Sequence, residues 1–95
     1  MKVFSRRPGV ELLEVSGEYL LVATKEARDA CPYVTQINAA AADYWKLMDK
    51  PYAAAEFVDL AARSFDMEKK SVLFRVMAFL SKMKQSGYLV EEDVE

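Results

Sequence analysis

The stretch Val10-Glu-Leu-Leu-Glu-Val-Ser-Gly-Glu-Tyr-Leu-Leu-Val-Ala23 decides the fold class of this 95-residue chain. It holds two runs of aliphatic and aromatic residues, 10–15 and 19–23, on either side of a short turn that contains Gly17. Two β-prone runs separated by a short glycine-containing turn are typical of a β-hairpin. The sequence therefore predicts that an antiparallel sheet precedes the rest of the fold.

Downstream of this hairpin, a polar loop over 24–30 leads to a third predicted strand, Tyr33-Val-Thr-Gln-Ile37. The run is rich in β-branched and aromatic residues, and Pro32 before it lacks an N–H group and so suits the start or the edge of a strand. In a three-stranded meander this strand lies at an edge, yet it has none of the charged residues that usually protect an edge. Two interpretations remain open: a helix or the N-terminal arm (1–8) covers the edge, or the edge accepts an extended peptide.

The next part of the chain predicts two helices. Asn38 can cap the first, from 39 to about 48, because its side-chain oxygen can accept a hydrogen bond from an unpaired N–H group of the first turn. Pro51 breaks that helix, since proline cannot continue the helical bonding pattern. The second helix is expected from about 53 to 64 or 65.

A third and longer helix is expected from about 67 to 86. Asp66 can cap its start, and Gly87 lies where a left-handed residue ends a helix. The acidic residues 91–95 are expected to form a frayed tail. Strands followed by helices predict a single α+β domain over 1–95, with a three-stranded antiparallel sheet followed by three helices that cover one of its faces.

Charge and residue content narrow the classes of function. The chain has 13 basic and 15 acidic residues, so it lacks the basic excess of a typical duplex-binding domain. It contains no histidine, which removes Ser-His and Cys-His nucleophile pairs. Cys31 is the sole cysteine, which we interpret as a packing residue, and one cysteine makes neither a disulfide nor a Cys/His zinc site. We therefore expect no enzyme, and no catalytic residue, metal or cofactor.

Nothing in the sequence suggests a membrane segment or a secretory signal. No apolar run approaches the roughly 18 residues that a membrane-spanning helix needs. The first eight residues carry charge but no apolar core of a signal peptide. We expect a cytoplasmic protein with no membrane partner.

The predicted third helix has more apolar surface than one packing face requires. A helix that packs on one side needs an apolar stripe a little over about 100° wide, whereas the apolar residues here span an arc of roughly 160°, with Phe74 further round. Either the helix is central and touches several neighbours, or one flank lines an open groove, bordered by Arg75 and Lys82. The residues of the arc are Val72, Leu73, Val76, Met77, Phe79, Leu80 and Met83.

Two stretches of the chain resemble the PqqD-like family in residue type, order and spacing. The first has a strand ending in an aliphatic-Asn pair, a small residue and an aromatic on the first helix, and an Asp at its end: Tyr33-Val-Thr-Gln-Ile-Asn38, Ala41, Trp45 and Met48-Asp49. The second matches the aliphatic, Phe-Leu, aliphatic and Gly-aromatic-Leu ending of the family: Val76, Phe79-Leu80, Met83 and Gly87-Tyr88-Leu89. The resemblance covers residues 8–90, nearly the entire chain.

The PqqD-like family includes the RiPP recognition elements, which are small winged-helix-like domains with three strands and three helices. The resemblance implies a peptide chaperone that binds the leader segment of a ribosomally synthesised precursor peptide and presents the peptide to a modifying enzyme, often a radical SAM protein. In that family the leader adds as a strand to the third strand and lies against the third helix. Carried over to this sequence, the implied peptide-binding residues are Tyr33, Val34, Thr35, Gln36 and Ile37 on the strand and Val72, Arg75, Val76 and Phe79 on the helix.

Alternatives to this interpretation remain open. Leu73 and Met77 could face the groove in place of the opposite flank of the third helix. The connection 25–32 is longer than the compact turn expected of PqqD itself, so the resemblance favours the wider set of recognition elements over the pyrroloquinoline quinone pathway. A winged-helix nucleic-acid-binding protein would share the topology, because a fold does not fix a function. A structural or oligomerisation subunit of a larger modifying enzyme, with a second copy paired as a homodimer at the open strand edge, is the third possibility.

Overall fold

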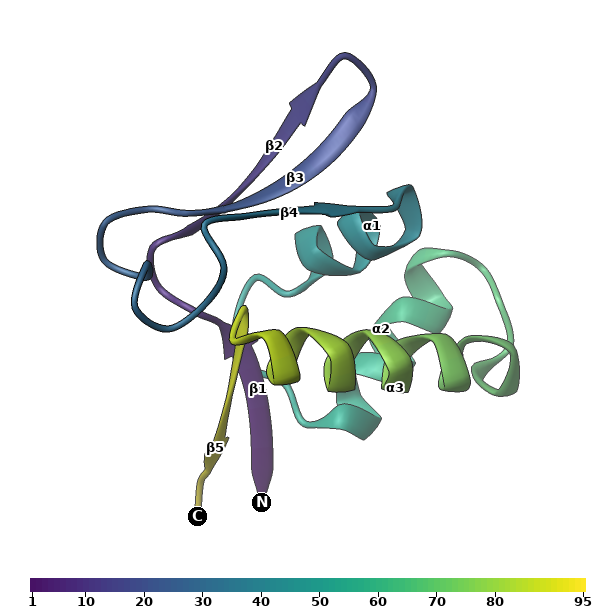
Figure 1. Cartoon of the computed structure of the whole chain (residues 1–95). Helices are drawn as coiled ribbons and strands as arrows, with labels where there is room; N and C mark the ends of the chain where they lie inside the picture. The colour runs from purple at the N-terminus through teal and green to yellow at the C-terminus, as the bar shows by residue number, and fades with distance from the viewer.

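The structure is a computed structural model that describes all 95 residues and has the expected α+β architecture (Figure 1). The strands β2, β3 and β4 form one antiparallel sheet in that order, and β1 pairs with β5 in a separate two-stranded sheet. Four strands therefore precede the helices and a fifth follows them, where only three had been expected. In chain order the elements are β1 (Lys2–Arg6), β2 (Val10–Val15), β3 (Glu18–Ala23), β4 (Val34–Ile37), α1 (Ala39–Leu47), α2 (Ala54–Ser64), α3 (Lys69–Ser86) and β5 (Leu89–Asp93).

The predicted hairpin is confirmed as β2 and β3, with Val10 opposite Ala23 and Val15 opposite Glu18. The turn consists of Ser16 and Gly17, which have φ angles of 51° and 79°. Positive φ at both central residues is the signature of the two-residue turn whose twist matches that of the flanking strands. Glu18 therefore belongs to the strand and not to the turn.

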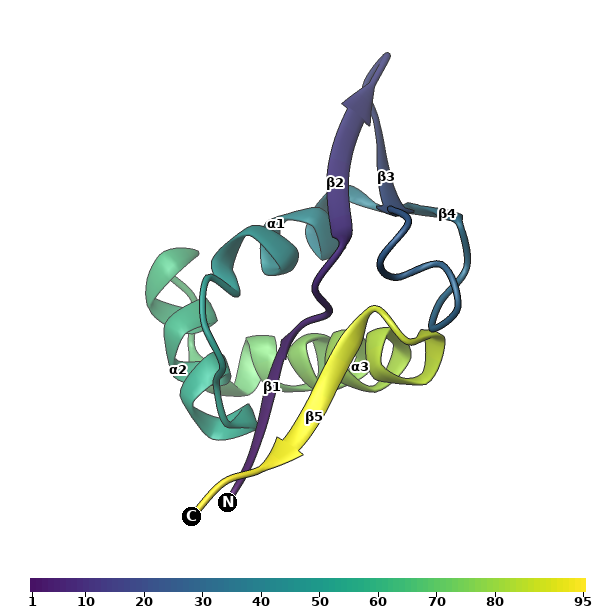
Figure 2. The same ribbon diagram turned by 90° about the vertical axis from the view of Figure 1, so that its left-hand side faces the viewer.

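The two ends of the chain form the unexpected sheet. Instead of an arm and a frayed tail, β1 and β5 pair antiparallel, and Figure 2 shows them side by side. Val3 and Leu89 are buried, so this sheet is part of the packed structure. Glu91 is half-buried and accepts a hydrogen bond from Lys84 at 2.9 Å, and this bond holds the pKa of its carboxyl below the usual value. The acidic composition of residues 91–95 favoured the prediction of a frayed tail, although three of these residues belong to β5.

The predicted helices are confirmed with small shifts at their ends. The Asn38 side chain accepts a hydrogen bond from the N–H of Ala41 at 2.8 Å and caps α1 as expected. The expected cap of α3 is wrong, because Glu68 occupies the N-cap position. Asp66 instead has a φ of 52° and ends α2, where the following N–H donates to the carbonyl of Ala62 at 2.9 Å. An Asp tolerates the left-handed conformation that this helix end requires.

Gly87 ends α3 as predicted. Its φ is 89°, its N–H donates to the carbonyl of Lys84 at 3.0 Å, and the N–H of Tyr88 donates to the carbonyl of Met83 at 2.9 Å. This pair of bonds is the Schellman arrangement, and the Met83 and Tyr88 side chains are both buried beside it. The bend sends the chain from α3 directly into β5.

The sheet and the helices share one hydrophobic cluster of 20 buried residues. It includes Leu21 of β3, Trp45 of α1, Phe57 of α2 and Val76 of α3, so each layer contributes to the same core. Cys31 is buried in it, and burial raises the pKa of the thiol above its ordinary value, with a smaller opposing effect of Arg7. Cys31 therefore packs as a neutral side chain, as expected. None of the helices has both the length and the apolar content that crossing a bilayer requires.

Candidate functional site

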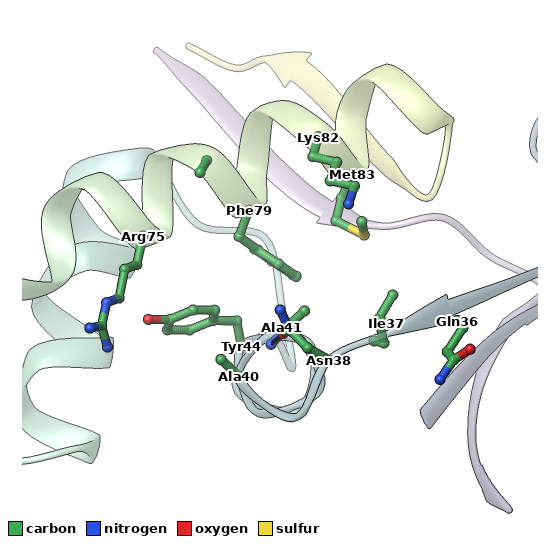
Figure 3. Close-up of a pocket in the computed structure, with 11 residues that line it drawn as sticks. Gln36, Ile37, Asn38, Ala40, Ala41, Tyr44, Arg75, Phe79, Lys82 and Met83 are labelled. Carbon is green, nitrogen blue, oxygen red and sulfur yellow. Dashed lines mark hydrogen bonds between the residues drawn. The ribbon is translucent and has the colours of Figure 1, made fainter. Parts of the chain in front are cut away.

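A hollow of about 420 Å³ opens where β4, α1 and α3 meet (Figure 3). Ligand pockets commonly measure about 300–1,000 Å³, so this hollow can accept side chains of a partner molecule. Most of its lining residues are apolar, and those of α3 are distant in sequence from those of β4 and α1, which follow one another directly. The lining residues are Gln36, Ile37, Asn38, Ala40, Ala41, Tyr44, Arg75, Ala78, Phe79, Lys82 and Met83.

The floor of the hollow consists of side chains whose bodies belong to the core. Ile37, Tyr44 and Phe79 are only 8%, 6% and 6% exposed, so each presents one edge to the hollow and packs its remaining surface inward. The Tyr44 and Phe79 rings lie 5.5 Å apart, and Tyr44 also meets the edge of Phe65 at 5.6 Å. Aromatic contacts at these distances add stability beyond that from buried area. The floor is therefore held in shape by the core itself.

The rim of the hollow is polar on both sides. The amide side chains of Gln36 and Asn38 border it on the β4 side, and Arg75 and Lys82 border it on the α3 side. Arg75 and Lys82 are exposed, and neither forms an ion pair within the chain. In Figure 3 the hydroxyl end of Tyr44 points toward Arg75. The hollow thus combines an apolar floor with two cations that no carboxylate neutralises.

The outer edge of β4 has unpaired peptide groups beside the hollow. Because β4 is the last strand in the order β2-β3-β4, no strand pairs with its second edge, and the N-terminal segment pairs with β5 instead. The Ala23 N–H donates to the Tyr33 carbonyl at 2.8 Å, so Ala23 and Tyr33 form a hydrogen-bonded pair between the two chain segments. Bonded and non-bonded pairs alternate along antiparallel strands, so Val34 and Gln36 direct their N–H and C=O groups away from β3. The edge is open to an added strand.

Tyr88 fixes the position of β4 relative to the end of α3. Its hydroxyl donates to the Pro32 carbonyl at 2.8 Å and lies 2.6 Å from Thr35 Oγ1. Since the single hydroxyl proton goes to Pro32, the Thr35 hydroxyl is the donor in the second bond. Burial raises the pKa of Tyr88, which keeps this donor protonated. These two bonds hold the open edge beside the hollow.

Tyr88→Phe is expected to lower the free energy of unfolding by about 1–3 kcal/mol, since two hydrogen bonds each contribute roughly 0.5–1.5 kcal/mol. The β4 amides should also exchange with solvent faster, because the strand loses its attachment to α3. Urea unfolding and hydrogen exchange by NMR measure the two effects. Tyr52→Phe is the matched control, because it removes a hydroxyl bonded to Asp49 at 2.6 Å and should leave exchange in β4 unchanged.

Some of the peptide-binding residues predicted from the sequence line the hollow, and others do not. Gln36, Ile37, Arg75 and Phe79 line the hollow. On β4 and just before it, Tyr33 is 56% exposed and Val34 is 46% exposed, while Thr35 is half-buried and bonded to Tyr88.

Val72 and Val76, which the sequence-based site included, do not line the hollow. Both are completely buried and support the α3 wall from inside the core. The alternative flank is also excluded from the hollow: Leu73 and Met77 are 41% and 44% exposed but do not line it.

The sequence did not predict that α1 contributes to the site. Ala40, Ala41 and Tyr44 form one side of the hollow, and Ala78 of α3 lies opposite them. The run of four alanines from 39 to 42 is the signal that was available, because small side chains leave space next to a helix. A helical-wheel analysis that considers only large apolar residues does not detect such a space.

The fold and the site together define a class of protein, namely a small α+β domain with an open strand edge beside an apolar groove. No protein-family model matches the sequence, and no curated protein sequence does so. Among solved structures, the chain is similar to a lasso peptide synthetase B1 complexed with the leader peptide, with a TM-score of 0.63 and 17% sequence identity. The alignment covers 92% of this chain and 96% of that chain. At this identity the similarity is one of fold.

Proposed function

We propose that this chain binds the leader segment of a ribosomally synthesised precursor peptide in the groove formed by β4, α1 and α3. The observation that carries the proposal is the position of the unpaired β4 edge directly beside the apolar hollow. An extended peptide can extend a sheet through main-chain bonds while alternate side chains enter neighbouring pockets. The resemblance to the PqqD-like family and the fold shared with a lasso peptide synthetase B1 complexed with the leader peptide support the same function.

The two parts of the groove have different roles in this function. Val34 and Gln36 supply outward N–H and C=O groups that set the register of the peptide. Each main-chain bond contributes only about 0.5–1.5 kcal/mol net, whereas micromolar affinity needs about 8 kcal/mol. Apolar side chains that enter the hollow provide the remainder, at roughly 1.5–3 kcal/mol each when fully buried. The hollow therefore determines affinity, and the strand edge determines alignment.

In this proposal the chain is a cytoplasmic peptide chaperone and not a catalyst. The bound leader leaves the core part of the precursor free for a modifying enzyme, for which a radical SAM protein is the first candidate. The open edge that accepts the leader would also accept β4 of a second copy, so leader binding and self-pairing exclude each other.

An NMR titration of labelled protein with the leader segment of a precursor encoded beside this gene tests the function. Binding should shift the amide signals of 34–37 and of the α3 turns that carry Arg75 and Lys82, and a scrambled leader should shift neither. Shifts that follow protein concentration instead of added peptide would indicate self-pairing. No shift at a large excess of leader, or tight salt-sensitive binding of duplex DNA by the same surface, would contradict leader binding.

Gln36→Pro is expected to weaken leader binding by about tenfold, because it removes an outward N–H and places a proline ring on the open edge. The bonds between β3 and β4 should persist, since Gln36 lies at a non-bonded position of that pair. Gln36→Val is the control that changes the side chain and keeps the N–H. Fluorescence anisotropy with a labelled leader compares the two variants. Equal affinity in both would mean that the peptide does not add to β4.

A further inference from the structure

The basic residues of α3 differ in whether a carboxylate neutralises them. The helix contains no acidic residue, although the chain as a whole carries a net charge of −2. Lys69 pairs with Asp59 at 2.8 Å, and Lys70 and Lys84 also have acidic partners within the chain. Arg75 and Lys82 have none. The basic residues in question are Lys69, Lys70, Arg75, Lys82 and Lys84.

Among the α3 cations, the two without an acidic partner are the two that line the hollow. Arg75 and Lys82 lie on the same wall with Phe79 between them, as Figure 3 shows. The two residues are seven positions apart, which corresponds to roughly 10 Å along the helix axis at about 1.5 Å per residue. An apolar side chain that enters the hollow against Phe79 would therefore have one cation on either side of it.

We infer that the peptide this groove binds carries carboxylates on both sides of its apolar anchor residue, two positions before it and two positions after it. The inference rests on the proposed peptide-binding function and adds the class of peptide. In an extended strand every second side chain points to the same face, and each residue advances about 3.3 Å. Side chains two positions before and after the anchor are thus roughly 13 Å apart, within reach of the flexible Arg75 and Lys82 side chains. The pattern is symmetric, so it applies to either direction of the peptide.

Both cations are exposed, so their contribution is to selectivity more than to total affinity. Exposed ion pairs are individually weak, and replacing both carboxylates of a bound peptide by amides should reduce affinity by about 3- to 20-fold. The effect should shrink as salt is raised, because the Debye length falls from about 10 Å at 0.1 M to about 3 Å at 1 M. Arg75 can additionally hold a carboxylate through two parallel hydrogen bonds, so it should be the stronger of the two.

Selection from a phage-displayed library of random dodecapeptides tests the inference. On the unchanged chain, the selected peptides should share an apolar residue with Asp or Glu two positions to either side. On the double variant Arg75→Glu with Lys82→Glu, the same positions should be enriched in Lys and Arg. The control Lys69→Glu with Lys70→Glu has the same net charge change on the same helix but lies outside the hollow, so it should select acidic peptides like the unchanged chain.

Synthetic versions of a selected peptide, with and without its carboxylates, then give the affinity ratio by fluorescence anisotropy. Arg75→Gln and Lys82→Gln are milder variants, and circular dichroism verifies that each variant is folded. Peptides that shift the β4 and α3 amides but show no acidic enrichment, or that bind the double charge reversal unchanged, would overturn the carboxylate inference and leave peptide binding intact. A library that yields no peptide bound at this groove would overturn both.

Discussion

Ala78→Trp is expected to weaken leader binding by about 10- to 100-fold, the largest loss of affinity that we predict from one substitution. Ala78 is an exposed α3 residue that lines the hollow, so an indole at this position occupies the space that an apolar leader side chain would enter. Losing the burial of one such side chain costs roughly 1.5–3 kcal/mol, which gives this range of affinities. Isothermal titration calorimetry with the leader segment measures the change.

Ser81→Trp is the matched control, because Ser81 is exposed on the same helix and does not line the hollow. Both substitutions are at surface positions, so the unfolding free energy should change by less than about 1 kcal/mol in either variant. Phe79→Asp would be a poor substitute, since Phe79 is buried and its ring lies 5.5 Å from Tyr44. If Ala78→Trp and Ser81→Trp bind the leader equally well, the hollow is not the binding groove.

Gly87→Ala is expected to have the largest effect on stability, a loss of about 3 kcal/mol or more. Alanine is disfavoured by roughly 1–2 kcal/mol at the φ of 89° that Gly87 adopts. In addition, a Cβ on this residue would collide with the carbonyl oxygen of Ala30, which is backbone and cannot rotate away. Urea unfolding should show the loss, and the melting temperature should fall by more than about 10 °C.

Gly17→Ala separates the two causes of this effect. Gly17 has a similar φ of 79°, but a Cβ there would meet nothing within 4 Å. Its substitution should therefore cost only the roughly 1–2 kcal/mol of the backbone conformation. A loss in Gly87→Ala no greater than that in Gly17→Ala would mean that the loop carrying Ala30 moves aside at little cost.

Local patterns in the sequence predicted most of the elements of the fold. The hairpin, β4, the Asn38 cap and the Gly87 helix end each depend on residues that lie within a few positions of one another. The pairing of β1 with β5 does not depend on nearby residues, because it joins Lys2 to Asp93 across nearly the full length of the chain. No local turn signal connects the two strands. Asp66 was misassigned for a different reason, since Asp is common both before a helix and in the left-handed position after one.

The candidate site was harder to predict than the fold. The third strand and the Arg75 and Phe79 side of α3 could be predicted, because an uncharged edge and a wide apolar arc are properties of the residues themselves. The hydrophobic periodicity of α3 could not distinguish Phe79, which reaches the hollow, from Val72, which is completely buried in the core. The contribution of α1 was missed because Ala40 and Ala41 shape the hollow through the volume that they leave empty. Such a space becomes visible only when the neighbouring helix is in place.

The pairing of the two chain ends has a consequence for rearranging the molecule. The Met1 amino group donates to the Val94 carbonyl at 2.7 Å, so the ends meet, and in Figure 1 both lie on the far side of α3 from β4. A short linker could close the chain into a ring that is reopened at the Ser16–Gly17 turn, where a Cβ on Gly17 meets nothing. Such a circular permutant would retain every strand pairing and would carry its new ends at the tip of the hairpin. The order in which the elements are connected would change, while the groove would keep all of its lining residues.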